Sequence, residues 1–121
     1  MACSKEDPKP VYTSIEGKWK FSAKDVSGEF YIVNYSGKLT VDNGPNDFFV
    51  VNGTRYSITS KHEVEGKLPG LLTFYLVNGD TYVILQKLDV NKTYDQFVTS
   101  NYEYGTGAKN TIVADKIILT R

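Results

Sequence analysis

Apolar and polar side chains alternate along most of this chain. In residues 18–24, Trp19, Phe21 and Ala23 fall on one face of an extended chain, whereas lysine and serine side chains fall on the other. Successive side chains of a β-strand point to opposite faces of its sheet, so this pattern predicts a strand with one buried face. Similar patterns predict further strands at 29–35, 37–42, 48–52, 54–62, 71–77, 80–89, 95–104 and 111–120.

Turn-forming residues separate these segments. Asn52-Gly53 and Asn78-Gly79 each lie between two apolar runs, and both residue types accept the positive φ of a type I′ turn, so each pair predicts a tight antiparallel hairpin. We interpret the similarity of the two hairpins as one local solution used twice rather than as an array of binding repeats. Only 11–16 and 90–94 leave room for a short helix. An all-β sandwich or barrel is therefore expected.

Length and charge restrict the domain count and the partners. The chain has 121 residues, which is enough for one domain, with 14 basic and 14 acidic side chains. This balance argues against recruiting nucleic acid or an anionic membrane surface through bulk charge. No apolar run approaches the roughly 20 residues that span a bilayer, so the folded part is expected to be soluble.

Groups with catalytic or metal-binding chemistry are sparse. His62 is the only histidine, and its sequence neighbours form neither a metal-ligand set nor a nucleophile–base pair. Turn chemistry explains the oxygen-rich stretch 42–47 at least as well as calcium binding does, and 105–110 is a hairpin loop rather than a phosphate loop. We therefore expect a protein that is not an enzyme and that uses no cofactor or metal.

The first residues differ in character from the rest of the chain. Cys3 is the only cysteine, so it cannot form a disulfide within the chain. Residues 4–10 carry no apolar side chain and contain two prolines, which discourage both helix and sheet. This composition predicts a flexible tether over residues 1–14 and one folded domain over residues 15–121.

This start resembles that of a mature bacterial lipoprotein of the Bacteroides type, with Cys3 as the lipidated residue and Lys5-Glu6-Asp7 as the export signal. The resemblance implies an outer-membrane lipoprotein that faces the cell surface, with the periplasmic face as the alternative. Its only membrane contact would be the lipid on Cys3. An incidental cysteine in a disordered tail is the alternative to lipidation.

The two ends of the predicted domain carry a second resemblance. Gly17-Lys18-Trp19 is similar to the Gly-x-Trp signature on the first strand of lipocalins and related calycins, and the last strand ends in Arg121. In that family an arginine lies across the tryptophan and closes one end of the barrel, a contact that suits a guanidinium and an indole face. The resemblance implies a small antiparallel up-and-down β-barrel of about eight strands, lipocalin-like, with Gly17, Trp19 and Arg121 as its closing group.

Aromatic side chains on the predicted strands are the candidate ligand-binding groups: Phe21, Tyr31, Tyr56, Phe74, Tyr82 and Tyr102. The first hypothesis is a lipid-anchored, non-enzymatic envelope module that binds a small apolar or amphipathic ligand inside the barrel. The alternative is a protein-interaction module, an inhibitor or an accessory subunit of an envelope complex, with a solid core. An internal void lined by aromatic rings would favour the first, and a close-packed interior the second. A monomer is expected in both cases.

Overall fold

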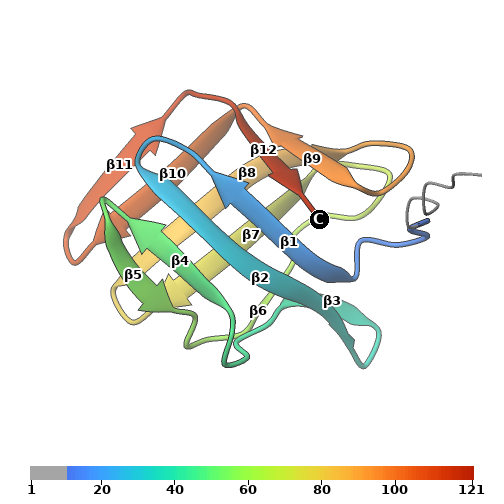
Figure 1. Ribbon diagram of the computed structural model, residues 1–121, viewed down its shortest axis with the longest axis horizontal. Coiled ribbons are helices and arrows are strands. Elements are labelled where there is room, and N and C mark those ends of the chain that lie inside the picture. Colours follow the sequence, from blue (N-terminus) through green and yellow to red (C-terminus); the bar gives the residue numbers. More distant parts are fainter. Residues whose placement is uncertain (1–10) are drawn as a thin grey trace, which may run out of the picture.

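The computed structural model describes residues 11–121, which form twelve β-strands and no helix (Figure 1). Every strand pair is antiparallel, so the all-β prediction is confirmed, and neither 11–16 nor 90–94 is helical. The described residues thus contain no helix with the length and apolar character needed to span a membrane. The strands are β1 (Gly17–Ser22), β2 (Val26–Tyr35), β3 (Lys38–Val41), β4 (Phe48–Val51), β5 (Thr54–Ser57), β6 (His62–Glu63), β7 (Leu72–Asn78), β8 (Thr81–Val90), β9 (Gln96–Thr99), β10 (Asn101–Thr106), β11 (Lys109–Val113) and β12 (Ile117–Thr120).

The strand order differs from that of an eight-strand up-and-down barrel. It runs β11-β10-β8-β9-β12-β1-β2-β3-β6, with β4 and β5 attached to β2, and β7 attached to β8. The predicted strands 95–104 and 111–120 are each divided into two strands whose sets of neighbours differ: β9 pairs with β8 and β12, β10 with β8 and β11, β11 with β10, and β12 with β9 and β1. The expected number and order of strands were therefore wrong, because an alternating pattern identifies extended chain but does not show where the chain changes its pairing partner.

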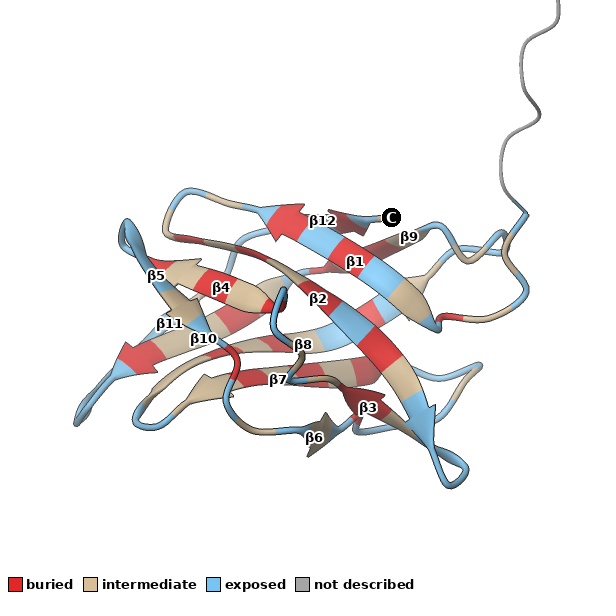
Figure 2. Cartoon of the chain, turned by 60° about the horizontal axis from the view of Figure 1, so that its bottom comes forward, coloured by how far each residue is buried: buried red, intermediate tan, exposed pale blue. Residues whose placement is uncertain are grey.

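The strands form two layers with the buried side chains between them. In Figure 2, β12, β1, β2 and β4 lie over β7, β8 and β10, and buried and exposed positions alternate along the strands. Two long strands take part in this arrangement: β2 pairs with β4 near its start and with β3 near its end, and β8 pairs first with β10 and then with β9. Lys87 of β8 has a φ of 53°, next to a register shift against β7, so a bulge bends β8 between its two sets of partners.

The two predicted hairpins form, with one change of detail. Asn52 and Gly53 both have positive φ, 49° and 86°, as the type I′ prediction requires. In the other hairpin Asn78 pairs with Thr81, so the turn consists of Gly79 and Asp80 instead of Asn78 and Gly79. Only Gly79 has positive φ there, 57°, and the turn begins at the glycine because the strand pairing extends one residue further than the sequence pattern indicated.

Candidate functional site

Arg121 lies across Trp19, as the resemblance implied. Its guanidinium carbon is 4.6 Å from the centroid of the Trp19 ring and 3.9 Å from that of the Tyr12 ring. Burial lowers the pKa of Arg121 from its ordinary value, and Tyr12 and Asp95 act in the opposite direction. Gly17, at a φ of 123°, makes this arrangement possible, because a Cβ there would lie 2.5 Å from Nη2 of Arg121.

Hydrogen bonds fix the same cluster to the backbone of the segment before β1 and of the loop between β8 and β9. Nη1 of Arg121 donates to the main-chain oxygens of Ser14 and Tyr94, each at 2.8 Å, and Nη2 donates to that of Glu16. Nε1 of Trp19 donates to the main-chain oxygen of Ile15 at 2.8 Å. The segment that precedes β1, part of which the sequence analysis assigned to the tether, is thus held against the last residue of the chain.

Aromatic rings fill the space between the two layers. Centroid distances link Trp19 to Phe97 at 4.6 Å, Phe97 to Phe74 at 5.1 Å, Phe74 to Phe30 at 5.7 Å, and Phe30 to Phe21 at 6.3 Å. These are the separations of rings in direct contact. All five side chains are buried, with exposed fractions of 0 to 5%. The rings that would have lined a ligand cavity therefore pack on one another.

The six aromatic residues expected to bind a ligand do not share one site. Phe21, Phe74 and Tyr102 are buried in the core, whereas Tyr31 is 41% exposed. The two remaining tyrosines, Tyr56 and Tyr82, are half-buried: Tyr56 stacks on Phe49 at 5.6 Å, and Tyr82 donates to Oε2 of Glu103 at 2.8 Å. That hydrogen bond raises the pKa of Tyr82. The aromatic side chains thus lie on both faces of the sheet, and only those on its inner face are fully buried.

The outer surface of β12, β1, β2 and β4 has a shallow depression of about 550 Å³. Its lining includes Ser22 and Ser27, which pair across β1 and β2 and whose small side chains leave space beside larger neighbours. Ile118, which is 45% exposed, and Phe48 line its sides. The sequence pattern gives no sign of this feature, because its residues come from four strands and only the pairing register places the two serines side by side.

Charged groups surround the same depression. Lys20 and Glu29 pair in register across β1 and β2 and both line the depression. Nζ of Lys18 lies 3.1 Å from a carboxylate oxygen of Glu29, and the guanidinium of Arg55 stacks 3.8 Å from the centroid of the Phe48 ring. The depression therefore combines exposed apolar surface with charges of both signs, and it is open to solvent.

Two further hollows flank Leu68, in the loop between β6 and β7. One, of about 460 Å³, is lined by Leu39 and Leu72 among others, and the other, of about 390 Å³, by Val90 and Tyr94 among others. This loop, the loop between β3 and β4 and the β10–β11 hairpin lie on three different sides of the molecule (Figure 1). They do not form one common contact surface.

The residues with metal or acid–base chemistry make local structural contacts. Nδ1 of His62 lies 3.3 Å from the main-chain oxygen of Ser60, and its ring packs against Tyr75 at 6.0 Å. In the loop 42–47, the main-chain N–H of Gly44 donates to Oδ2 of Asp47 at 3.0 Å, and burial raises the pKa of Asp47. Within residues 11–121 no group of three or more histidine, cysteine or acidic side chains is placed to hold a metal ion.

Cys3 and the Lys5-Glu6-Asp7 run lie outside the described residues. No protein-family model, curated protein or solved structure matches the chain. The site is therefore described by its geometry alone: aromatic rings pack on one another between the two layers, and the depression over β12, β1, β2 and β4 lies on the outer surface.

Proposed function

We propose that this protein is a lipid-anchored, non-enzymatic interaction module of the bacterial envelope, built as a lipocalin-like barrel with a solid core. Two features support the barrel. The contact between Arg121 and Trp19 joins the two ends of the domain, and paired backbone hydrogen bonds between Glu65 and Thr73 link the segment after β6 to β7. β7 in turn pairs with β8. The bonds between Glu65 and Thr73 therefore connect the β6 end of the strand order with β8 through β7, which is the kind of connection that closes a barrel.

The observation that carries the functional proposal is the filled interior. A binding protein that encloses a small molecule needs a preformed void of a few hundred Å³. Here the buried rings of Trp19, Phe97, Phe74, Phe30 and Phe21 occupy the corresponding space. A solid domain is better suited to present its surface to another protein.

The outer depression is the contact surface in this proposal. Exposed apolar side chains such as Ile118, next to the charged pair Lys20 and Glu29, provide both burial and orientation for a partner. The strands that carry these residues are held by β-pairing on both sides, so the surface is preorganised and little ordering entropy is lost on binding.

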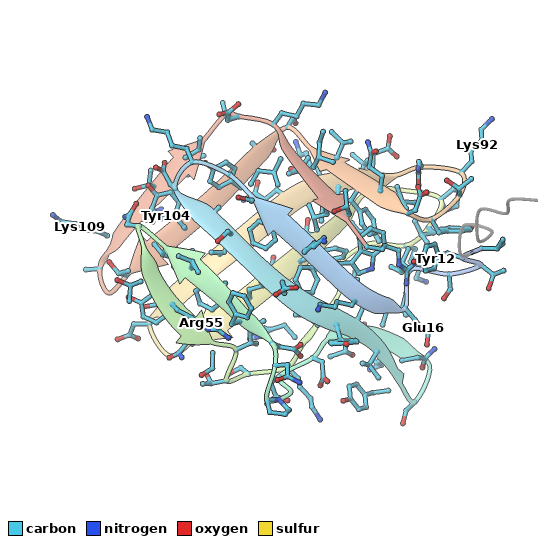
Figure 3. The ribbon with its side chains drawn as sticks, viewed as in Figure 1. Tyr12, Glu16, Arg55, Lys92, Tyr104 and Lys109 are labelled. Carbon is cyan, nitrogen blue, oxygen red and sulfur yellow. The ribbon has the colours of Figure 1, made fainter. Side chains whose placement is uncertain are left out.

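Site-directed photo-crosslinking in producing cells tests this surface. A benzophenone amino acid at Thr120, an exposed residue in the depression, is expected to give one discrete adduct with an envelope protein. The same probe at Lys92, which does not line the depression and projects outward from the loop between β8 and β9, is the control and should not give that adduct (Figure 3).

Adding Ile118→Arg should reduce the Thr120 adduct by about tenfold or more, because charged replacement of an apolar contact residue removes at least ~1.4 kcal/mol of binding. Since Ile118 is 45% exposed, the unfolding midpoint should change little. Equal adducts from Thr120 and Lys92, or no effect of Ile118→Arg, would contradict the proposal. A small molecule retained by the natively purified protein in mass spectrometry would instead support the ligand-binding hypothesis.

Lipid anchoring at Cys3 is tested separately by metabolic labelling. In a Gram-negative host, with the chain expressed behind a lipoprotein signal peptide, radioactive palmitate is expected on the wild-type protein and not on Cys3→Ser. Label on neither protein would remove the anchor from the proposal. Protease treatment of intact cells distinguishes the two membrane faces, since only a surface-exposed domain would be digested.

A further inference from the structure

β11 is a free edge of the sheet. It pairs with β10 on one side and ends the strand order, and no other strand of residues 11–121 pairs with its second side. Four of its five residues are exposed, and Ile112, 67% exposed, is the most exposed large apolar side chain in any strand. In Figure 1 β11 forms an outer rim of the molecule, and in Figure 3 Lys109 projects away from it. An edge of this kind is a template for another strand.

The register shows which backbone groups of β11 are available. Thr106 pairs with Lys109 across the two-residue turn of Gly107 and Ala108, so these two residues exchange both of their hydrogen bonds. Hydrogen-bonded and non-hydrogen-bonded positions alternate along an antiparallel pair. The N–H and C=O groups of Asn110 and Ile112 therefore point away from β10, toward the free side.

β5 is another strand with one unpaired side, and the charge in its middle protects that side in a way that has no counterpart in β11. β5 pairs only with β4, and its closing pair is Val51 with Thr54, so the backbone groups of Arg55 and Ser57 point outward. A second copy that paired symmetrically there would bring two Arg55 guanidinium groups together. Charged side chains on an edge are a common protection against such pairing. β11 has a single charge, Lys109, at its end.

We propose that two copies of this chain associate through β11, antiparallel to one another, with the two-fold axis at Thr111. In this register Asn110 lies opposite Ile112 of the second copy, and their outward N–H and C=O groups bond in both directions. The proposal does not depend on the proposed function, and it departs from the monomer expected from the sequence.

Two side-chain contacts make β11 complementary to itself. The Ile112 side chains of the two copies become diagonal neighbours on one face, which covers the most exposed strand isoleucine on both sides. On the other face Lys109 lies opposite Val113 of the second copy, and Asp115 of the second copy follows two residues later, just beyond the end of β11. Each Lys109 thus approaches a carboxylate, and no like charges oppose each other.

Sedimentation equilibrium of the full chain tests the dimer. From low micromolar to millimolar concentration, the mass is expected to rise from that of one 13.6 kDa chain toward twice that value. Asn110→Pro removes an outward N–H without removing a hydrogen bond to β10, and should weaken association by about tenfold or more. Asn110→Ala keeps the N–H and is the matched control, for which we expect dissociation close to wild type.

A charge exchange makes the test specific to this register. Lys109→Glu should weaken the dimer because it places a second acid near Asp115, and Lys109→Glu with Asp115→Lys should restore it. Circular dichroism of each variant verifies that the domain is folded. A monomer at every concentration would overturn the proposal, and so would a dimer that Asn110→Pro or Lys109→Glu leaves unchanged.

Discussion

Replacing Trp19 with alanine is expected to lower the free energy of unfolding by about 3 to 5 kcal/mol, as truncation of large buried aromatic side chains does. The Trp19 side chain is fully buried, contacts the Phe97 ring at 4.6 Å and donates to the main-chain oxygen of Ile15 at 2.8 Å. Its removal leaves a cavity and an unpaired carbonyl, and takes away the ring beneath Arg121. Trp19 is the only tryptophan, so urea unfolding should be followed by circular dichroism instead of fluorescence.

Tyr31→Ala is the matched control, since Tyr31 is 41% exposed and its loss should cost less than about 1 kcal/mol. A loss of under about 1 kcal/mol for Trp19→Ala would mean that the closing group does not hold the domain together. Combining Trp19→Ala with Arg121→Ala separates their shared contribution. We expect the double variant to lose less than the sum of the two single variants, because the guanidinium and the indole stabilise each other.

Phe74→Ala is expected to destabilise the domain by a similar amount, about 3 to 5 kcal/mol. Phe74 is fully buried and lies between Phe30 and Phe97, with centroid distances of 5.7 and 5.1 Å. Removing this ring opens a void in the centre of the aromatic core. An apolar void of this kind stays dry and can bind benzene, whereas the filled native core cannot.

Calorimetry with benzene therefore distinguishes a solid core from a ligand cavity. We expect benzene to bind the folded Phe74→Ala variant and to show no binding to the wild type. Phe48→Ala, which truncates a half-buried ring at the outer depression, is the control that should bind no benzene in the interior. Equal binding by wild type and Phe74→Ala would reveal a native cavity, and the solid-core proposal would fail.

Local sequence located most of the extended segments and both hairpins. The alternation around Trp19 and Phe21 predicted a half-buried strand, and β1 has both residues buried with the exposed Lys20 between them. The Asn52-Gly53 turn forms with positive φ at both residues. These features depend on neighbouring residues only: on the two-residue repeat of side-chain direction and on which residues tolerate positive φ.

The candidate surfaces could not be predicted from the local sequence. Ser22, Ser27 and Ile118 carry no signal as individual residues, and they line one depression only because β12, β1 and β2 are neighbours in this register. The filled core likewise depends on how Phe30, Phe74 and Phe97 meet across the two layers. An aromatic residue at a buried strand position fits a cavity wall and a packed core equally well in the sequence.

By itself, therefore, the sequence determined that the domain is all-β and where most of its strands and two hairpins lie, and the resemblance at its two ends implied that Gly17, Trp19 and Arg121 meet. Only the tertiary structure decided the order of the twelve strands, the packing of the aromatic rings into a continuous core, and the free edge at β11. The physical reason is the range of the interactions. Backbone preference and side-chain alternation act between adjacent residues, whereas pairing partners, packing and exposure are set by contacts between segments distant in the chain.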